Sequence, residues 1–387
     1  FTNDIIRLKG RLDFLIGIIS NKNIKLINYN ILNILRLSFY EILYCDNIPE
    51  YATVNSAVNL TKDLLSKKAS GFTNFILRKL INDKNTDGNF FDKYKTNYEW
   101  NSFPIWIQKK WEKEYGKENF LRLINFFNKR QNTYVRLNTT ILKDKIYKEL
   151  KNNGFTYEVF NNDFIKLKSG IRKLLNSNLF KNGSISIQDP AAGAIVELLD
   201  LKNKDIVLDI CAAPGTKSIY IAEKIGNEGK VYAFDNDKKR IEKARADFKR
   251  HKKKNIFWKQ KDATCDIYPN ADKILIDVPC SGTGVIGNKP DIRWRRNSDD
   301  LIEMSKLQLR ILQNVSNFLN KGGSLVYSTC SLEKEENWDV IEKFLKFNVN
   351  FKLDKLNKII PRDWVDAKGC LNTIPFEHNV GGMFAAK

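Results

Sequence analysis

The stretch Ile206-Val207-Leu208-Asp209-Ile210-Cys211-Ala212-Ala213-Pro214-Gly215-Thr216-Lys217 decides the fold, because an apolar run ends in a turn of small residues. A short apolar run bounded by turn residues predicts a buried strand, and a helix is predicted to follow over 218–224. Small residues let the backbone of a turn approach a ligand closely, and the first N–H groups of a helix lack partners within the helix. We therefore expect a ligand at the carboxyl end of this strand.

Further apolar runs alternate with helical segments along the rest of the chain. Strands are predicted at the following positions: 206–210, 230–234, 256–259, 273–277 and 324–328. This alternation favours an α/β fold with an open, largely parallel sheet and crossover helices. The turn contains neither G-x-G-x-x-G nor a P-loop, which argues against hydride and phosphoryl transfer.

Two acidic residues extend the predicted ligand site. Asp235 ends the second strand, close to the spacing of about 20 residues at which an acid binds a ribose hydroxyl in nucleotide-binding folds. Asp262 follows the third strand and suits the adenine side of a nucleoside ligand. Small residues after a strand are also common in tight turns that bind nothing. The agreement of the turn, both acids and the strand order favours the ligand site.

Cysteines follow the fourth and fifth strands, in Asp277-Val278-Pro279-Cys280 and Tyr327-Ser328-Thr329-Cys330-Ser331. Neighbouring strands lie about 4.8 Å apart, so both thiols could reach one small ring. A thiolate that attacks carbon 6 of cytosine makes carbon 5 nucleophilic enough to accept a methyl group from a sulfonium donor. A second group can then help to remove the proton from carbon 5, and Asp277 is placed to stabilise the electron-rich ring.

The alternative for any single cysteine is a small buried apolar residue. We adopt that interpretation for Cys45, Cys265 and Cys370, and we interpret Cys211 as a wall of the ligand turn. Six cysteines without a CxxC pair, together with two histidines, support neither a zinc site nor a disulfide framework. We expect reduced thiols and no metal.

The chain of 387 residues is long enough for two or three domains. Residues 1–88 have apolar positions at helical spacing and predict an all-helical domain, which ends at the polar segment 83–88. Helices at 105–115 and 120–129 predict a connector, and shorter periods from 133 onward predict a small α+β unit. We therefore place domain boundaries at 1–88, 89–182 and 183–387.

The chain has 65 Lys and Arg against 45 Asp and Glu, a net charge of +20 that favours nucleic acid as a partner. An AT-rich coding sequence would also raise the lysine content without any ligand. The first residue is Phe1, no leader is recognisable, and no stretch approaches the roughly 20 apolar residues of a membrane span. We expect a cytoplasmic monomer that does not bind membranes.

A basic segment, Arg293-Trp294-Arg295-Arg296, follows the Cys280 loop. Trp294 could stack on an unpaired base while the arginines hold phosphates. Alternatively, Trp294 lies in the core and the basic residues form an ordinary helix entrance.

The blocks CAAPGTK, DVPCSGTG and YSTCSLEKEEN resemble those of the bacterial rRNA 5-methylcytosine methyltransferases of the RsmB/Sun (Fmu) type. The resemblance implies a Rossmann-like, class I S-adenosylmethionine-dependent methyltransferase domain. Val135-Arg136-Leu137-Asn138 resembles the start of the family's small RNA-contacting domain, which makes Arg136 a candidate RNA contact. Residues 41–78 are similar to the family's NusB-type helical module, of which the first helix is expected to be partly absent.

The resemblance implies that Cys330 is the nucleophile and that Cys280 assists product release. It implies that S-adenosylmethionine binds the following residues: Cys211, Ala212, Ala213, Pro214, Gly215, Thr216, Lys217, Asp235, Asp262 and Asp277. Of these, Asp277 serves the cofactor, the cytosine base or both. The substrate implied is a cytidine of 16S rRNA. A tRNA cytosine-C5 methyltransferase and a non-catalytic NusB-like RNA-binding protein are the alternatives. Thr216 in place of a second Gly and Gly381-Gly382-Met383-Phe384 in place of DGFF depart from the family pattern.

Overall fold

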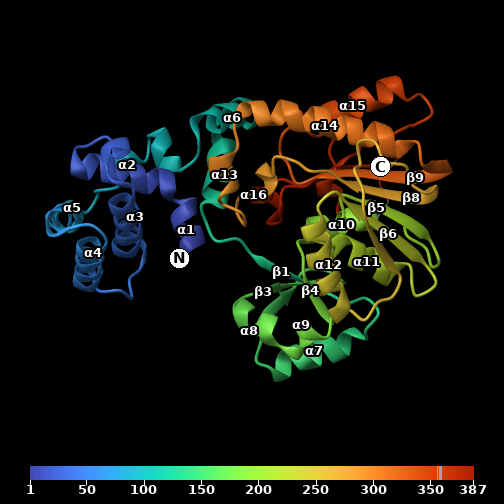
Figure 1. Cartoon of the computed structure of the whole chain (residues 1–387), viewed down its shortest axis with the longest axis horizontal. Coiled ribbons are helices and arrows are strands. Elements are labelled where there is room, and N and C mark those ends of the chain that lie inside the picture. The colour runs from blue at the N-terminus through green and yellow to red at the C-terminus, as the bar shows by residue number, and fades with distance from the viewer. Residues whose placement is uncertain (355, 357–359) are drawn as a thin grey trace. The chain divides into compact units, whose positions relative to one another are not determined.

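The computed structural model describes residues 1–354, 356 and 360–387 (Figure 1). Contacts within the chain divide it into two units. The first unit contains Phe1–Arg130 and Ile286–Arg295, and the second contains Gln131–Val285 and Arg296–Lys387. The boundaries predicted at 88 and 182 stay predictions. No helix in the described ranges combines the length and apolar character needed to cross a membrane.

The first unit is all helical, as predicted. Its helices are α1 (Thr2–Arg7), α2 (Lys9–Ser20), α3 (Tyr29–Tyr44), α4 (Glu50–Leu64), α5 (Lys67–Thr86), α6 (Ile105–Phe127) and α13 (Ile292–Arg295). The apolar faces of α2 to α5 form one core that includes Leu35, Phe39 and Ile76. Two helices were predicted at 105–115 and 120–129, and α6 agrees with them: it consists of two helical parts separated by Gly116 at φ 75°, and the second part ends at Phe127.

The second unit begins with a small antiparallel sheet in the order β2-β3-β1-β4. Its strands are β1 (Thr133–Leu137), β2 (Tyr157–Val159), β3 (Phe164–Leu167) and β4 (Ile185–Ile187). Helices α7 (Lys143–Asn152), α8 (Ile171–Asn176) and α9 (Asn178–Lys181) accompany the sheet. Alternate strand residues such as Val135, Ile165 and Ile185 are buried with these helices, which gives the predicted α+β unit its own core.

The second unit continues with a seven-stranded sheet in the order β10-β11-β9-β8-β5-β6-β7. Its strands are β5 (Ile206–Ile210), β6 (Lys230–Asp235), β7 (Ile256–Gln260), β8 (Ala271–Asp277), β9 (Leu319–Thr329), β10 (Leu371–Asn372) and β11 (Phe384–Ala386). The strands β5 to β9 pair in parallel, and β10 and β11 are antiparallel. Strand β9 begins at Leu319, before the predicted start at 324. The prediction began too late because Gly322 and Gly323 resemble a turn in sequence.

Helices cover both faces of this sheet (Figure 1). One core joins the sheet to α10 (Pro190–Glu197), α11 (Thr216–Lys224) and α12 (Lys238–Arg250). The other core joins the sheet to α14 (Ser298–Ser316) and α15 (Trp338–Phe347), and the short α16 (Pro375–His378) lies near the carboxyl end of the chain. Because β8 lies between β5 and β9, the turn after β5 and both cysteine loops meet at one edge of the sheet.

Candidate active site

The ends of β8 and β9 bring the two cysteines together. Asp277 pairs with Ser328 in the register of these parallel strands, and each cysteine follows shortly after its strand. The sulfur atoms of Cys280 and Cys330 lie 3.0 Å apart, and the backbone N–H of Cys330 donates to the Cys280 sulfur at 3.3 Å. Both thiols are therefore close enough to contact the same small ring.

A buried carboxylate ties the two cysteine loops to each other. Glu336 accepts a hydrogen bond from the backbone N–H of Ser281 at 2.8 Å and bonds from the hydroxyls of Ser281 and Ser331, the latter at 2.5 Å. The amide of Gln308 on α14 donates to the same carboxylate at 2.9 Å. Each serine directly follows one of the two cysteines, so Glu336 links the backbones that carry both thiols.

Glu336 was not predicted from the sequence. It lies in the run Glu333-Lys334-Glu335-Glu336-Asn337, which reads as a polar helix entrance. In the structure Glu336 is fully buried, and the side chain of Asn337 also donates to the backbone carbonyl of Ser331 at 2.9 Å. No spacing rule distinguishes the two buried acids of this run, Glu333 and Glu336, from Glu335, because Ser281 and Gln308, which donate to Glu336, come from distant segments.

Burial and the neighbouring sulfur determine the state of Cys280. The hydrogen bond with Cys330, then burial, then the charge of Cys330 and that of Glu336 all raise the pKa of the Cys280 thiol well above its usual value. A thiol with a raised pKa is protonated near neutrality. Cys280 is therefore a poor resting nucleophile and a strong base once its proton has left.

Asp277 does not stand alone at the end of β8. Its carboxylate accepts from the Lys217 ammonium at 2.7 Å and from the Ser328 hydroxyl at 2.9 Å. Burial lowers the pKa of Lys217, but attraction to Asp277 and to Cys330 outweighs it and leaves the pKa raised. Lys217 is thus a permanent cation beside Asp277 and Cys330, and a nearby cation stabilises a thiolate.

The turn after β5 is held by Asp235. The Asp235 carboxylate accepts from the backbone N–H of Ala213 at 3.1 Å, and Arg240 donates to the Ala213 carbonyl. Gly215 directly precedes α11 as its N-cap residue, with φ 99°, in the left-handed region that favours glycine. An added Cβ there would lie 3.0 Å from the Trp258 ring, so only glycine lets the turn pack this closely.

Of the remaining residues predicted for this site, Asp262 follows β7, and the others belong to the turn after β5. Asp262 is exposed, and its carboxylate accepts from the Thr264 hydroxyl at 2.7 Å. Ala212 is buried, whereas Pro214 is exposed. Burial raises the pKa of the Cys211 thiol, which fits a wall of the turn and not a reactive group.

Comparison with known proteins now decides the family. The 16S rRNA methyltransferase RsmB/F family matches residues 196–387, and the NusB family matches residues 1–82. The probable ribosomal RNA small subunit methyltransferase B of Bacillus subtilis is 31% identical over 388 residues, which cover 97% of this chain and 86% of that protein. The chain belongs to the RsmB/F family. It is therefore a methyltransferase, and its first unit contains a NusB-type region.

Solved structures agree with this membership. The crystal structure of PH0851 has a TM-score of 0.82 and 28% identity, and the match covers 99% of this chain and 87% of that one. A methyltransferase homologue protein from Pyrococcus horikoshii has a TM-score of 0.61 and 31% identity over 70% of this chain and 90% of its own. The predicted class I methyltransferase fold is confirmed.

Two predicted RNA contacts of this RsmB/F chain are wrong. Arg136 is fully buried in the second unit, where its guanidinium donates to Glu223 and, at 2.6 Å, to Gln188. Arg293 is 1% exposed in the first unit and donates to the backbone carbonyls of Arg7 and Ser102. Guanidinium groups without solvent-exposed surface cannot contact RNA, so both arginines stabilise the fold instead.

The other three positions of the basic segment, Trp294, Arg295 and Arg296, differ from one another. The Trp294 indole is half-buried and donates to the Ile6 carbonyl at 2.7 Å, so the alternative of a packed tryptophan fits better than a free stacking surface. Arg295 is exposed and pairs with Asp291. Arg296 donates to the carbonyls of Cys280 and Ser281, both at 3.3 Å, which places it beside the reactive loop.

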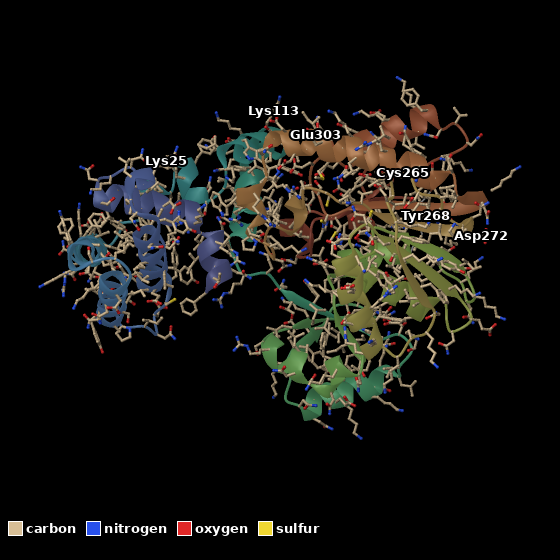
Figure 2. The ribbon with its side chains drawn as sticks, in the orientation of Figure 1. Lys25, Lys113, Cys265, Tyr268, Asp272 and Glu303 are labelled. Carbon is tan, nitrogen blue, oxygen red and sulfur yellow. The ribbon has the colours of Figure 1, made fainter. Side chains whose placement is uncertain are left out.

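The remaining cysteines lie away from the reactive pair. Cys265 is exposed in the loop between β7 and β8 (Figure 2). Cys370 is buried, and burial raises its pKa to about 12. Burial likewise raises the pKa of Cys45. None of the three has a neighbouring thiol among the described contacts.

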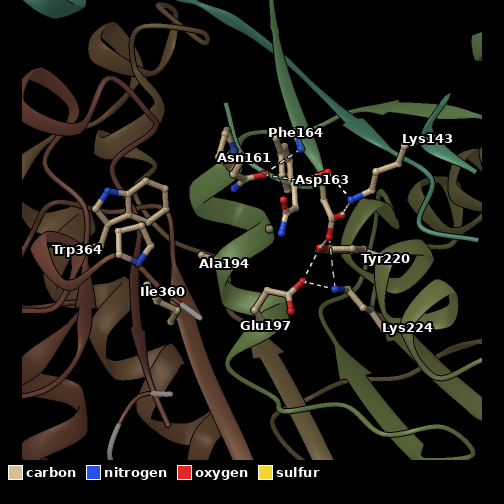
Figure 3. A pocket seen from close by; sticks show the side chains of 14 residues that line it. Lys143, Asn161, Asp163, Phe164, Ala194, Glu197, Tyr220, Lys224, Ile360 and Trp364 are labelled. Atoms are coloured by element: carbon tan, nitrogen blue, oxygen red, sulfur yellow. Dashed lines mark hydrogen bonds and ion pairs between the residues drawn. The ribbon is translucent and has the colours of Figure 1, made fainter. Parts of the chain in front are cut away.

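A cavity of about 420 Å³ lies elsewhere in the second unit, between the small sheet and helices α10 and α11 (Figure 3). Asp163 on the small-sheet side accepts from Lys143 at 2.9 Å and from the Tyr220 hydroxyl at 2.9 Å. Lys224 pairs with Glu197 at 2.8 Å. The two acids and two lysines on the wall neutralise one another, so the wall offers no net charge to a ligand. Their ion pairs and hydrogen bonds join the small-sheet side to helices α10 and α11.

Proposed function

We propose that this chain methylates carbon 5 of a cytidine in 16S rRNA, with S-adenosylmethionine as the donor. Membership of the RsmB/F family supports the substrate class. The observation that carries the chemistry is the 3.0 Å distance between the sulfurs of Cys280 and Cys330 at the carboxyl edge of the sheet. One thiol makes a bond to the ring, and the other manages a proton.

Cys330 is the proposed nucleophile. Its thiolate, favoured by the nearby Lys217 cation, adds to carbon 6 of the cytosine and forms a carbon–sulfur bond. The electron pair displaced toward carbon 5 takes up the methyl group. Asp277, on the same edge, stabilises the electron-rich ring when it is protonated, as a carboxylic acid that donates a hydrogen bond to nitrogen 3.

Cys280 is proposed to act second, and the structure supports a reason for this order. The largest cause of its raised pKa is the hydrogen bond with Cys330, and the charge of Cys330 adds to it. Once Cys330 has bonded to carbon 6, both influences disappear, so the pKa of Cys280 falls and its proton can pass to solvent water. The Cys280 thiolate then takes the proton from carbon 5, and the bond between Cys330 and carbon 6 breaks.

The residues at this edge fit S-adenosylmethionine. The turn of small residues, the carboxylates of Asp235 and Asp262, and the Lys217–Asp277 pair offer groups for a ribose, an adenine and an amino acid with both charges. When bound, the cofactor supplies a methyl group on a sulfonium. No metal is needed for this chemistry.

The NusB-type region distinguishes this proposal from a tRNA enzyme, and the thiol pair distinguishes it from a non-catalytic RNA-binding protein. We also keep the boundaries at 88 and 182 as a proposal. The test incubates the full chain with methyl-labelled S-adenosylmethionine and either 16S rRNA or tRNA, followed by digestion and identification of the nucleoside. Label in 5-methylcytidine from 16S rRNA is expected. Label only on nitrogen or ribose, or only in tRNA, would refute the proposal.

A further inference from the structure

We propose that helix α12 and the following residues 252–254 form a track for the phosphodiester backbone of the RNA substrate, separate from the thiol site. This inference rests on the proposed RNA substrate and extends it to a binding surface. From Asp237 to Lys254 the chain carries ten basic and three acidic residues, a surplus of seven within a net charge of +20. The track is defined by its seven lysines: Lys238, Lys239, Lys243, Lys249, Lys252, Lys253 and Lys254.

The arginines of this segment are committed to the fold. Arg240 donates to the Ala213 carbonyl, Arg245 to the Trp258 carbonyl at 2.9 Å, and Arg250 to the carbonyls of Phe180 and Ile185. Arg240 and Arg245 are exposed and Arg250 is half-buried, but these bonds tie all three guanidinium groups to neighbouring backbone. They do not account for the lysines.

The lysines are different. Six of the seven are exposed and Lys253 is half-buried, and within the described part of the chain none of their side chains makes a hydrogen bond or an ion pair. Of the three acids, Asp237 caps the helix and Asp247 pairs with Arg250. Glu242 is thus the acid that remains to offset the lysines. A positive stripe that is not neutralised by the protein itself suits a polyanion.

The position of α12 connects two parts of the second unit. At its beginning, the backbone N–H of Asp237 donates to Asp235, which holds the ligand turn. At its end, Arg250 binds carbonyls on α9 and β4, at 2.7 and 2.8 Å. A strand of RNA on this helix would run from the small sheet toward the edge that carries the thiols. Exposed Lys181 on α9 extends the positive surface at that end.

The test measures the affinity of the full chain for a 16S rRNA fragment by fluorescence anisotropy over a series of salt concentrations. The variant carries Lys243→Gln, Lys249→Gln and Lys254→Gln. Each lost phosphate contact lowers the slope of log affinity against log salt by about 0.7 for single strands, so three lower it by about 2. If the lines meet near 1 M salt, affinity at 0.1 M falls about 100-fold.

The matched control carries Lys321→Gln, Lys343→Gln and Lys346→Gln, three exposed lysines on β9 and α15 that have the same total charge. The wild-type slope is expected for this control and for a variant with arginine at 243, 249 and 254. If the two glutamine variants have equal slopes of log affinity against log salt, whether both are lowered or both are unchanged, the proposed track is wrong. The proposal is also wrong if binding of the wild type does not depend on salt. Methyl transfer is not needed for this measurement, so failure of the proposed reaction gives a different result: RNA binds but carries no 5-methylcytidine.

Discussion

Removal of the Glu336 carboxylate tests whether the approach of the two thiols depends on the loops that carry them. The change Glu336→Ala leaves both cysteines in place and removes the acceptor shared by Ser281, Ser331 and Gln308. If the cysteine loops are held mainly by this carboxylate, the sulfurs will no longer lie 3.0 Å apart on average.

The structure sets the size of the expected loss in stability. The serine hydroxyls can bond to each other, since they already lie 3.0 Å apart, and Gln308 keeps its bond to the Pro279 carbonyl. The backbone N–H of Ser281 has no such substitute and stays buried without a partner, at a cost of about 1–3 kcal/mol. With the cavity left by the shortened side chain, we expect Glu336→Ala to lower the free energy of unfolding by about 3 kcal/mol.

The expected loss in activity has a separate cause, which is the displacement of the thiols in the folded variant. A displacement of about 1 Å at the reacting atoms lowers the rate about 100-fold. We therefore expect the single-turnover rate of methyl transfer to 16S rRNA to fall about 100-fold in Glu336→Ala, at a temperature where the variant is folded. Glu336→Gln keeps an acceptor for Ser281, and the serine hydroxyls can rotate to accept from its amide, so we expect a loss of less than about 10-fold.

Two results would refute this reasoning. A folded Glu336→Ala protein with the wild-type rate would show that the carboxylate does not position the thiols. Equal losses in the alanine and glutamine variants would show that the negative charge matters and not the hydrogen-bond geometry. Glu342→Ala, on the exposed side of α15, is the matched control and should keep both the stability and the rate of the wild type.

Three further predictions concern the thiols, a buried histidine and a close glycine contact. Cys280→Ser should accumulate a covalent protein–RNA adduct on denaturing gels, while Cys330→Ser should form none; the reverse pattern would exchange the two roles. Burial lowers the pKa of His251 to about 3, so between pH 6.5 and 3 only the unfolded chain binds this proton, and stability falls as the pH falls. In urea titrations His251→Gln should therefore lose about 1.4 kcal/mol less per pH unit than the wild type, and parallel curves would contradict the assignment. A Cβ at Gly284 would lie 2.0 Å from the Gly382 carbonyl oxygen, so Gly284→Ala should destabilise the protein by about 3 kcal/mol in thermal unfolding, whereas Gly71→Ala, with open space around it, should not.

The sequence predicted those features that depend on local pattern and on the order of strands. The apolar run at 206–210 forms β5 over the same residues, and the turn after it lies at the carboxyl edge of the sheet as expected. The thiols meet because each follows a parallel strand and because β8 and β9 are neighbours. A parallel sheet brings the carboxyl ends of its strands together, so this approach follows from the fold alone.

The features that the sequence did not predict depend on partners far along the chain. Arg136 is buried because Glu223, 87 residues away, and Gln188, 52 residues away, satisfy its guanidinium. Glu336 can be buried because its carboxylate accepts from the backbone N–H of Ser281, which lies 55 residues before it. A charged residue with a distant partner looks in sequence like any charged residue on the surface, so composition and periodicity assign it to solvent.

The lysines and arginines of this chain differ in how many of them are available to bind RNA. Described arginines such as Arg136, Arg240 and Arg250 bind carboxylates or backbone carbonyls inside the protein, where a planar guanidinium makes several directed hydrogen bonds. The α12 lysines make none, and their flexible ammonium groups suit phosphates that follow no fixed geometry. Net charge alone therefore overstates the surface for RNA, because only cations that the fold leaves unused can contribute to it.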